Sequence, residues 1–214
     1  MRLVGVFGGT FNPIHHGHLR LAQELADTLD LAEVRFIPSA NPPHKKAPAV
    51  SATQRAAMVQ LAIANNPKFT LDTRELKRSG ASYTIDTLMS VHDELDDAAL
   101  CLIMGSDAFL TLDTWHRWQE LINFSHIVLV QRPQAVNSSG LSPALNTLMQ
   151  QHYTEDLSAL TQQRAGCITM QSISALDISS SHIRHLIQHQ HSAAYLLPES
   201  VLAYIKQHHL YLTA

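Results

Sequence analysis

The sequence predicts an α/β fold in which helices cover both faces of an open, doubly wound and mainly parallel sheet. Short apolar runs alternate with longer amphipathic stretches, as in repeated strand–helix units. The runs are almost continuously apolar, which is typical of parallel strands buried on both faces. The predicted strands are Leu3–Phe7, Val34–Ile37, Ala98–Met104 and Ile127–Val130, with Ile168–Gln171 as a weaker candidate.

Helix signals stand between and after these strands. The apolar residues of Ala22–Leu29 recur at the spacing i, i+3, i+4, i+7, which places them on one helix face. Ser51 and Gln54 form a capping-box pattern, which predicts the start of another helix. Ile183–Ile187 repeats the helical spacing late in the chain. Ligands of doubly wound sheets bind at the carboxyl ends of strands, so we expect functional residues where strands pass into helices.

Two segments interrupt the alternation of strands and helices. Residues 38–50 are rich in proline and are not expected to form regular structure, and residues 133–146 are predicted to be an exposed loop. The sequence contains neither an internal repeat nor a recognisable linker. We therefore expect a single domain over residues 1–214, whose C-terminal helical part covers residues 179–214.

Composition excludes some partners. The chain has 214 residues, of which 45% are hydrophobic, and a formal net charge of -3. This charge provides no basic field for nucleic acid or an anionic membrane, so we expect neither partner. We also expect no signal peptide and no membrane-spanning helix, because no long apolar segment is present. Cys101 and Cys167 lie in apolar runs and are expected to be buried free thiols, which fits a cytoplasmic protein.

The stretch GGTFNPIHHGH follows the first predicted strand. Gly8, Gly9 and Thr10 stand where the sheet ends, and glycines there let backbone N–H groups approach an anion. The positive end of the next helix points at the same place. Neither the P-loop pattern nor G-x-G-x-x-G is present, so the positive charge must come from other residues. His15 and His18 are the candidates, and phosphate binding is the favoured interpretation.

Two other interpretations of this stretch stay open. The histidines could belong to a turn that caps the helix and have no further role. They could also bind zinc, but the flanking carboxylate or cysteine ligands that such sites use are missing. A zinc hydrolase is therefore the least favoured function.

A second candidate stretch, ISSSHIR, covers Ile178–Arg184. Its serines come just before the apolar stripe of the late helix, so one of them is a candidate N-cap and the others offer hydroxyl and amide groups. Arg184 falls in the first turn, beside the positive helix end. This arrangement suits the outer phosphates of a nucleotide. Taken alone, the stretch favours an ordinary capped surface helix.

Three stretches in the middle of the chain suit a second substrate. NPPHKK places His44, Lys45 and Lys46 on a proline-braced loop that suits a phosphate group, although a lysine pair on a loop is more often simply solvated. SYTIDTL, residues 82–88, opens a helix whose first amides could hold a carboxylate or a phosphate. Trp115, in TWHRW, could stack on a flat ring, whereas Trp118 suits the core.

These residues together resemble a known family. GTFNPIHHGH, in which HHGH matches H-x-G-H, resembles the first signature of a nucleotidyltransferase superfamily, and ISSSHIR matches its second signature, I-S-S-[ST]-x-I-R. With PPHK, ELKRSGASYTIDTL, IMGSDAFLTLDTW, VQRP and LLPESVLAYI, nearly the whole chain resembles the bacterial nicotinate-mononucleotide adenylyltransferases. The resemblance implies a Rossmann-like fold. It also implies that ATP, accompanied by Mg²⁺, and nicotinate mononucleotide react to give deamido-NAD and pyrophosphate.

The resemblance assigns roles to individual residues. The catalytic, charge-stabilising residues would be His15, His18 and Arg184. The other residues around ATP would be Gly8, Gly9, Thr10, Phe11, Gly105, Asp107, Ser179 and Ser180. Those around the acceptor would be His44, Lys45, Tyr83, Thr84, Trp115 and Arg132. The chain departs from the family at Asn12, where an aspartate is usual, so a role for a carboxylate there is in doubt.

Other functions stay open. An enzyme that prefers nicotinamide mononucleotide would differ in whether groups near Thr84 and His116 face an amide or a carboxylate. A phosphopantetheine adenylyltransferase shares the first signature, but PPHK and TWHRW argue against it. A nucleotide-binding module without turnover would not need His15, His18 and Arg184 together. The sequence leaves the oligomeric state open, including a homo-oligomer.

Overall fold

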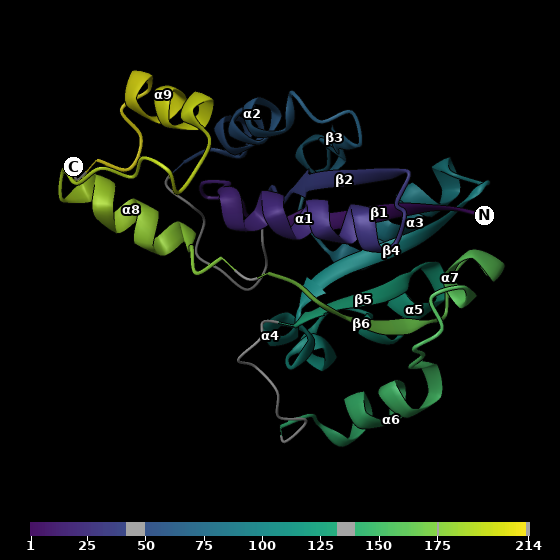
Figure 1. Ribbon diagram of the computed structural model, residues 1–214. Coiled ribbons are helices and arrows are strands. Elements are labelled where there is room, and N and C mark those ends of the chain that lie inside the picture. Colours follow the sequence, from purple (N-terminus) through teal and green to yellow (C-terminus); the bar gives the residue numbers. More distant parts are fainter. Residues whose placement is uncertain (42–49, 132–139, 175, 213–214) are drawn as a thin grey trace.

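The computed structural model describes residues 1–41, 50–131, 140–174 and 176–212. Its centre is a six-stranded, entirely parallel sheet with the strand order β3-β2-β1-β4-β5-β6 (Figure 1). The strands are β1 Arg2–Gly9, β2 Glu33–Pro38, β3 Phe69–Leu71, β4 Ala98–Gly105, β5 His126–Gln131 and β6 Ile168–Ser172. This is the order of the doubly wound Rossmann fold, so the predicted fold class is confirmed.

Helices pack on both faces of the sheet (Figure 1). The α-helices are α1 His16–Thr28, α2 Ala52–Ile63, α3 Thr84–Glu94, α4 Ser106–Phe109, α5 Leu121–Phe124, α6 Pro143–His152, α7 Ala159–Gln162, α8 Ser180–Gln188 and α9 Glu199–Gln207. Short 3₁₀ turns are η1 Arg74–Lys77, η2 Leu112–Thr114 and η3 Trp118–Glu120. Residues of α1, α2, α8 and α9 pack in one apolar layer, and residues of α3, α5 and α6 pack in the other.

Alternate residues of the central strand supply the two layers. Leu3 and Phe7 belong to the layer with α1, whereas Val4 and Val6 belong to the layer with α3. Successive strand side chains point to opposite faces, so a strand covered on both sides has to be apolar throughout. This explains why the sequence shows continuous apolar runs.

All five predicted strands are present, and the sequence analysis missed one. β3 is a three-residue edge strand, too short for its apolar residues to stand out as a run. The helix predicted at Ser51 and Gln54 is α2, in which the Ser51 hydroxyl accepts a hydrogen bond from the backbone N–H of Gln54 at 3.2 Å. The sequence prediction for residues 38–50 falls mostly outside the described residues.

The prediction of a loop over residues 133–146 is wrong at its C-terminal end. Helix α6 begins at Pro143, where proline is favoured because the first helical N–H has no partner to lose. Ser142 is its N-cap, and its hydroxyl accepts from the backbone N–H of Leu145 at 3.3 Å. Serine and proline were interpreted as loop residues, although together they also mark a helix start.

The cysteine prediction is confirmed. Cys101 and Cys167 are buried and do not form a disulfide. Burial raises the pKa of the Cys101 thiol to about 12, which keeps it protonated and unreactive near neutral pH. In the part of the chain that the structure describes, no helix combines the length and the apolar character needed to cross a membrane.

Candidate functional site

The candidate site lies at the carboxyl ends of β1 and β4, where the strand order changes direction. Strand β1 pairs with β2 on one side and with β4 on the other. The chain adds β2 and β3 on the first side of β1 and then crosses to add β4, β5 and β6 on the other side. Such a switch point opens a crevice for ligands. Figure 1 shows that α1 begins at this end of the sheet and that α8 lies beyond it.

His15 and His18 form a stacked pair at the start of α1. His15 is the N-cap residue and is only 5% exposed, and His18 lies in the first turn. Their rings stack with centroids 3.7 Å apart and planes 26° apart. The backbone N–H of His15 donates to Nδ1 of His18 at 3.3 Å. This bond requires an unprotonated Nδ1, so the neutral tautomer that accepts it carries the ring proton on Nε2.

Aromatic side chains support His18 from the sheet side. Phe11 and Phe7 present edge contacts to its ring, with centroids 5.2 Å and 6.2 Å away. Phe11 is buried and has a left-handed backbone with φ of 45°. A Cβ atom at Gly9 would lie 2.9 Å from the Phe11 ring, so glycine is needed there. The Phe11 side chain is therefore part of the core beneath the loop.

The surroundings of Gly8 and Gly17 differ. A Cβ atom at Gly8 would meet no atom within 4 Å, so the space beside this backbone is open. A Cβ atom at Gly17 would lie 3.0 Å from Nδ1 and 3.1 Å from Cε1 of His15. The glycine of the H-x-G-H pattern thus makes room for the first histidine ring.

The second signature joins the first one directly. The hydroxyl of Ser180 donates to the carbonyl of Pro13 at 2.9 Å, and Nη1 of Arg184 donates to the carbonyl of Asn12 at 2.8 Å. Ser179 is the N-cap of α8, and its hydroxyl accepts from the backbone N–H of His182 at 3.1 Å. Two stretches far apart in the sequence therefore form one surface at the end of β1.

The side chain of Asn12 is held from the C-terminal end of the chain. The Tyr211 hydroxyl donates to Oδ1 of Asn12 at 2.7 Å. Burial raises the pKa of the Tyr211 phenol, so it is present as the neutral donor. The asparagine oxygen accepts this bond without a negative charge. The sequence analysis did not connect Tyr211 to the site, because nothing near it in the sequence marks a contact with residue 12.

Gly105 and Asp107 lie at the end of the neighbouring strand. Gly105 is the N-cap of the short helix α4, and no atom would lie within 4 Å of a Cβ there. The Asp107 side chain is exposed. Both residues share the carboxyl edge of the sheet with the loop after β1.

Three residues predicted to surround the acceptor are described by the structure, and they lie at the start of α3 and at the end of η2. Tyr83 is the N-cap of α3, and Thr84 is its first residue. The ring of Tyr83 packs on that of His116 with centroids 4.3 Å apart. Trp115 is half-buried and, like Tyr83, packs against the layer that contains α3. The predicted residues His44, Lys45 and Arg132 lie outside the described residues.

Two residues that the sequence analysis missed organise this region. The Ser82 hydroxyl accepts from the backbone N–H groups of Ala40 and Asn41 at 3.1 and 3.2 Å. This ties the segment after β2 to the start of α3. The second residue is Arg55 of α2, which is 1% exposed and donates to the carbonyls of Thr10 and Ser39. The sequence did not indicate either role, because both side chains contact backbone groups, which every residue type supplies.

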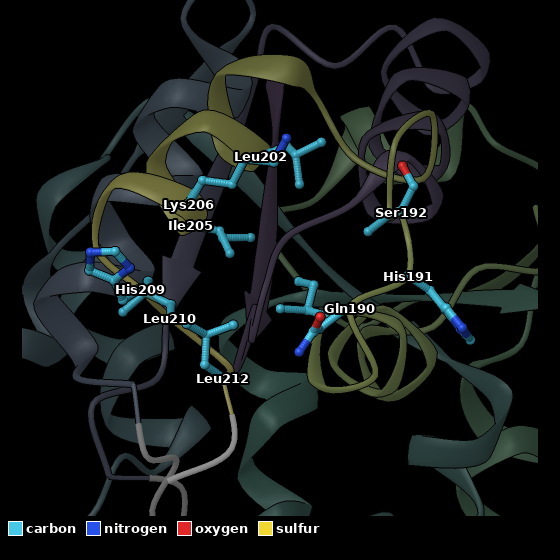
Figure 2. Close-up of a pocket in the computed structure, with 11 residues that line it drawn as sticks. Gln190, His191, Ser192, Leu202, Ile205, Lys206, His209, Leu210 and Leu212 are labelled. Atoms are coloured by element: carbon cyan, nitrogen blue, oxygen red, sulfur yellow. The ribbon is translucent and has the colours of Figure 1, made fainter.

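A cavity of about 400 Å³ lies elsewhere, between α8 and α9 (Figure 2). Leu202, Ile205 and Leu210 form apolar parts of its wall, and Lys206 and His191 are among its polar residues. None of its lining residues belongs to the predicted site. The candidate site is instead the open surface at the ends of β1 and β4.

The predicted site residues suit a metal ion that arrives with a ligand. Asp107 is the one carboxylate among them, and it is exposed. Across the described ranges, no three His, Cys, Asp or Glu side chains come together as a metal-binding cluster. Mg²⁺ usually keeps several waters and binds through one or two carboxylates together with substrate phosphates, so this donor set fits Mg²⁺ carried by a triphosphate.

The sequence and the fold both match known proteins. Residues 6–186 match the family described as cytidylyltransferase-like. A protein of Aeromonas salmonicida named "Probable nicotinate-nucleotide adenylyltransferase" is 47% identical over 212 residues, which cover 97% of this chain and 96% of that protein. A protein of the same name from Acidithiobacillus ferrooxidans is 43% identical over 206 residues, with 96% and 94% covered.

Solved structures match the fold over nearly the whole chain. The Plasmodium falciparum nicotinic acid mononucleotide adenylyltransferase complexed with NaAD has a TM-score of 0.73 at 16% identity, covering 99% of this chain and 98% of its own. The same enzyme complexed with APC has a TM-score of 0.71 at 15% identity, with 99% and 98% covered. At this identity the match concerns the fold alone.

Proposed function

This chain belongs to the cytidylyltransferase-like family and, within it, to the nicotinate-nucleotide adenylyltransferases, and on that premise we propose that it transfers the adenylyl group of ATP to nicotinate mononucleotide. The products are deamido-NAD and pyrophosphate. The observation that carries this proposal is the meeting of the two signatures, through Ser180 and Arg184, at the carboxyl end of β1. These contacts bring a histidine pair, a guanidinium and the starts of two helices close to one another, an arrangement that suits a polyphosphate.

The chemical step is an in-line displacement. A phosphate oxygen of nicotinate mononucleotide forms a bond to the α-phosphorus of ATP, and the bond from that phosphorus to the bridging oxygen breaks. Pyrophosphate leaves with the bonding electron pair. The attacking phosphate has a second pKa of about 6, so it is mostly ionised near neutral pH and needs no general base. Catalysis therefore depends on positioning and on offsetting negative charge.

The residues of the two signatures supply these effects. Nε2–H of His18 donates to the phosphate oxygens that gain charge, and His15 holds the His18 ring in place by stacking. Arg184 and the start of α8 face the outer phosphates. Mg²⁺ carried by the triphosphate would neutralise further charge on the phosphate oxygens. Gly8, Gly9 and Thr10 let the backbone approach the phosphates closely.

The acceptor lies on the side of α3. Tyr83, Thr84 and Trp115 surround the pyridine ring, and the backbone N–H groups at the start of α3 receive its carboxylate. His44 and Lys45 hold the acceptor phosphate, with Arg132 close to it. The chain acts as one nucleotidyltransferase domain in the cytoplasm, where reducing conditions suit its two buried free thiols.

Pyrophosphate release tests this proposal. The purified chain is incubated with ATP and Mg²⁺ and, separately, with nicotinate mononucleotide, nicotinamide mononucleotide or phosphopantetheine. We expect release with the nicotinate compound to exceed release with either of the others. Faster release with nicotinamide mononucleotide or with phosphopantetheine would identify that compound as the preferred acceptor and contradict the proposal. No release with any acceptor would favour a nucleotide-binding module without turnover.

Gly17→Ala tests the reason for the glycine in H-x-G-H. The added methyl group would lie 3.0 Å from the His15 ring, so the stacked pair must move. Alanine is favoured over glycine in helices by about 1 kcal/mol, and the fold is therefore expected to survive. We expect kcat to fall at least tenfold with a melting temperature close to that of the wild type. Unchanged kcat would show that the histidine geometry tolerates displacement.

A further inference from the structure

Arg55 is a buried charge that the proposed mechanism does not use. It lies in the first turns of α2, and only 1% of it is exposed. Nη1 donates to the carbonyl of Thr10 at 2.7 Å, and Nη2 donates to the carbonyls of Ser39 at 2.6 Å and Ala40 at 3.4 Å. One guanidinium thus holds backbone from two separate loops.

These two loops carry the two proposed substrates. Thr10 belongs to the phosphate loop after β1, and Ser39 and Ala40 begin the segment after β2 that leads to His44. The backbone N–H of Ser39 also donates to the carbonyl of Gly9 at 2.9 Å, so the two loops are neighbours.

The buried Glu75 carboxylate stabilises the charge of Arg55 electrostatically, but it makes no ion pair with Arg55. No Asp or Glu of the described residues forms an ion pair with Arg55, and its Nε has no hydrogen-bond partner there. Arginine stays protonated even when it is buried. Burying a charge is costly even where hydrogen bonds and the charge of Glu75 offset part of the cost, so a residue that served only to fill the core would be apolar.

We propose that Arg55 is a positioning residue that clamps the ATP loop to the acceptor loop and so sets the distance between the attacking phosphate and the α-phosphorus. The inference rests on the proposed function, since it assigns one substrate to each loop. In-line transfer is sensitive to small displacements of either reactant. The guanidinium carries its donors on separate nitrogens, so Nη1 binds one loop while Nη2 binds the other. Lysine carries all its donors on one nitrogen and therefore cannot reproduce this spacing.

Arg55→Lys and Arg55→Met test the clamp. Lysine keeps the charge, and methionine keeps much of the apolar volume. We expect both variants to lower kcat at least tenfold, whereas the Kd for ATP alone, measured by calorimetry, changes less than threefold. Full activity of Arg55→Lys would overturn the clamp, because charge alone would then suffice. A loss of ATP affinity as large as the loss of kcat would also overturn it and indicate a purely structural role.

A matched control separates the clamp from the general cost of removing an arginine. Arg35 of β2 is also largely buried but pairs with Glu33 and Glu94, away from the site. Arg35→Met is expected to lower the melting temperature and leave kcat within about twofold. A decrease in kcat equal to that of Arg55→Met would remove the special role of Arg55.

Hydrogen–deuterium exchange gives a readout that does not depend on the reaction. In Arg55→Met we expect faster exchange at both Thr10–Asn12 and Ser39–Asn41, with the exchange of β4 unchanged. Faster exchange in only one of the two loops, or throughout the sheet, would contradict the clamp. If wild-type protein released no pyrophosphate with any acceptor, the proposed function would fail, while this exchange pattern would still show whether Arg55 joins the loops.

Discussion

His18→Ala is expected to lower kcat for pyrophosphate release about 10²- to 10³-fold, the loss typical of removing one preorganised donor to a developing charge. The donor here is Nε2–H, because Nδ1 accepts the hydrogen bond from the backbone of His15. The binding of ATP in the ground state is expected to weaken much less. Steady-state rates at saturating ATP and nicotinate mononucleotide measure the effect.

Two further variants sharpen this test. His16→Ala changes the neighbouring histidine, which stands in the variable position of the signature, and we expect it to keep kcat within about twofold. His18→Gln places an N–H donor near the position of Nε2 and is expected to lose less activity than His18→Ala. If His16→Ala were as damaging as His18→Ala, the effect would come from disturbance of α1 and not from a donor.

The sequence predicted the parts of this molecule that depend on local patterns. Apolar runs gave the long strands, since central parallel strands are buried on both faces. The pattern of Ser51 and Gln54 gave α2, since a capping box acts within four residues. β3 escaped because its three residues are held mainly by pairing with β2, a long-range contact without a local signal.

The same distinction between local patterns and long-range contacts applies to the candidate site. His15, His18, Ser179 and Arg184 were predicted from short patterns, and the structure brings them together. Arg55 and Tyr211 were missed, although both contact the first signature. Arg55 works through backbone carbonyls, and any segment of the chain can supply a carbonyl. No residue type at the partner position could therefore have revealed that contact.

Arg184→Ala is expected to lower kcat by about 10²-fold or more, because in the proposed mechanism the variant loses a charge at the outer phosphates as well as the bond to the first signature. That bond joins Nη1 to the carbonyl of Asn12, and Nη2 also donates to the Ser181 hydroxyl. The KM for ATP is expected to rise as well. Rates measured across a range of ATP concentrations separate the two effects.

Stability measurements then decide between charge and fold as the origin of the loss. Removing a hydrogen bond to a charged group costs about 1.5 to 3 kcal/mol, which corresponds to a decrease in melting temperature of only about 3 to 12 °C in a chain of this size. Such a variant remains folded at assay temperature, so unfolding would not explain a hundredfold loss. Arg184→Lys keeps the charge but makes fewer directed bonds, and its kcat is expected to lie between those of the wild type and Arg184→Ala. His182→Ala, which alters an exposed side chain of the same helix turn, serves as the control and should retain the wild-type kcat. A lysine variant no better than alanine would assign the role of Arg184 to its bond with Asn12, and full recovery by lysine would assign it to charge alone.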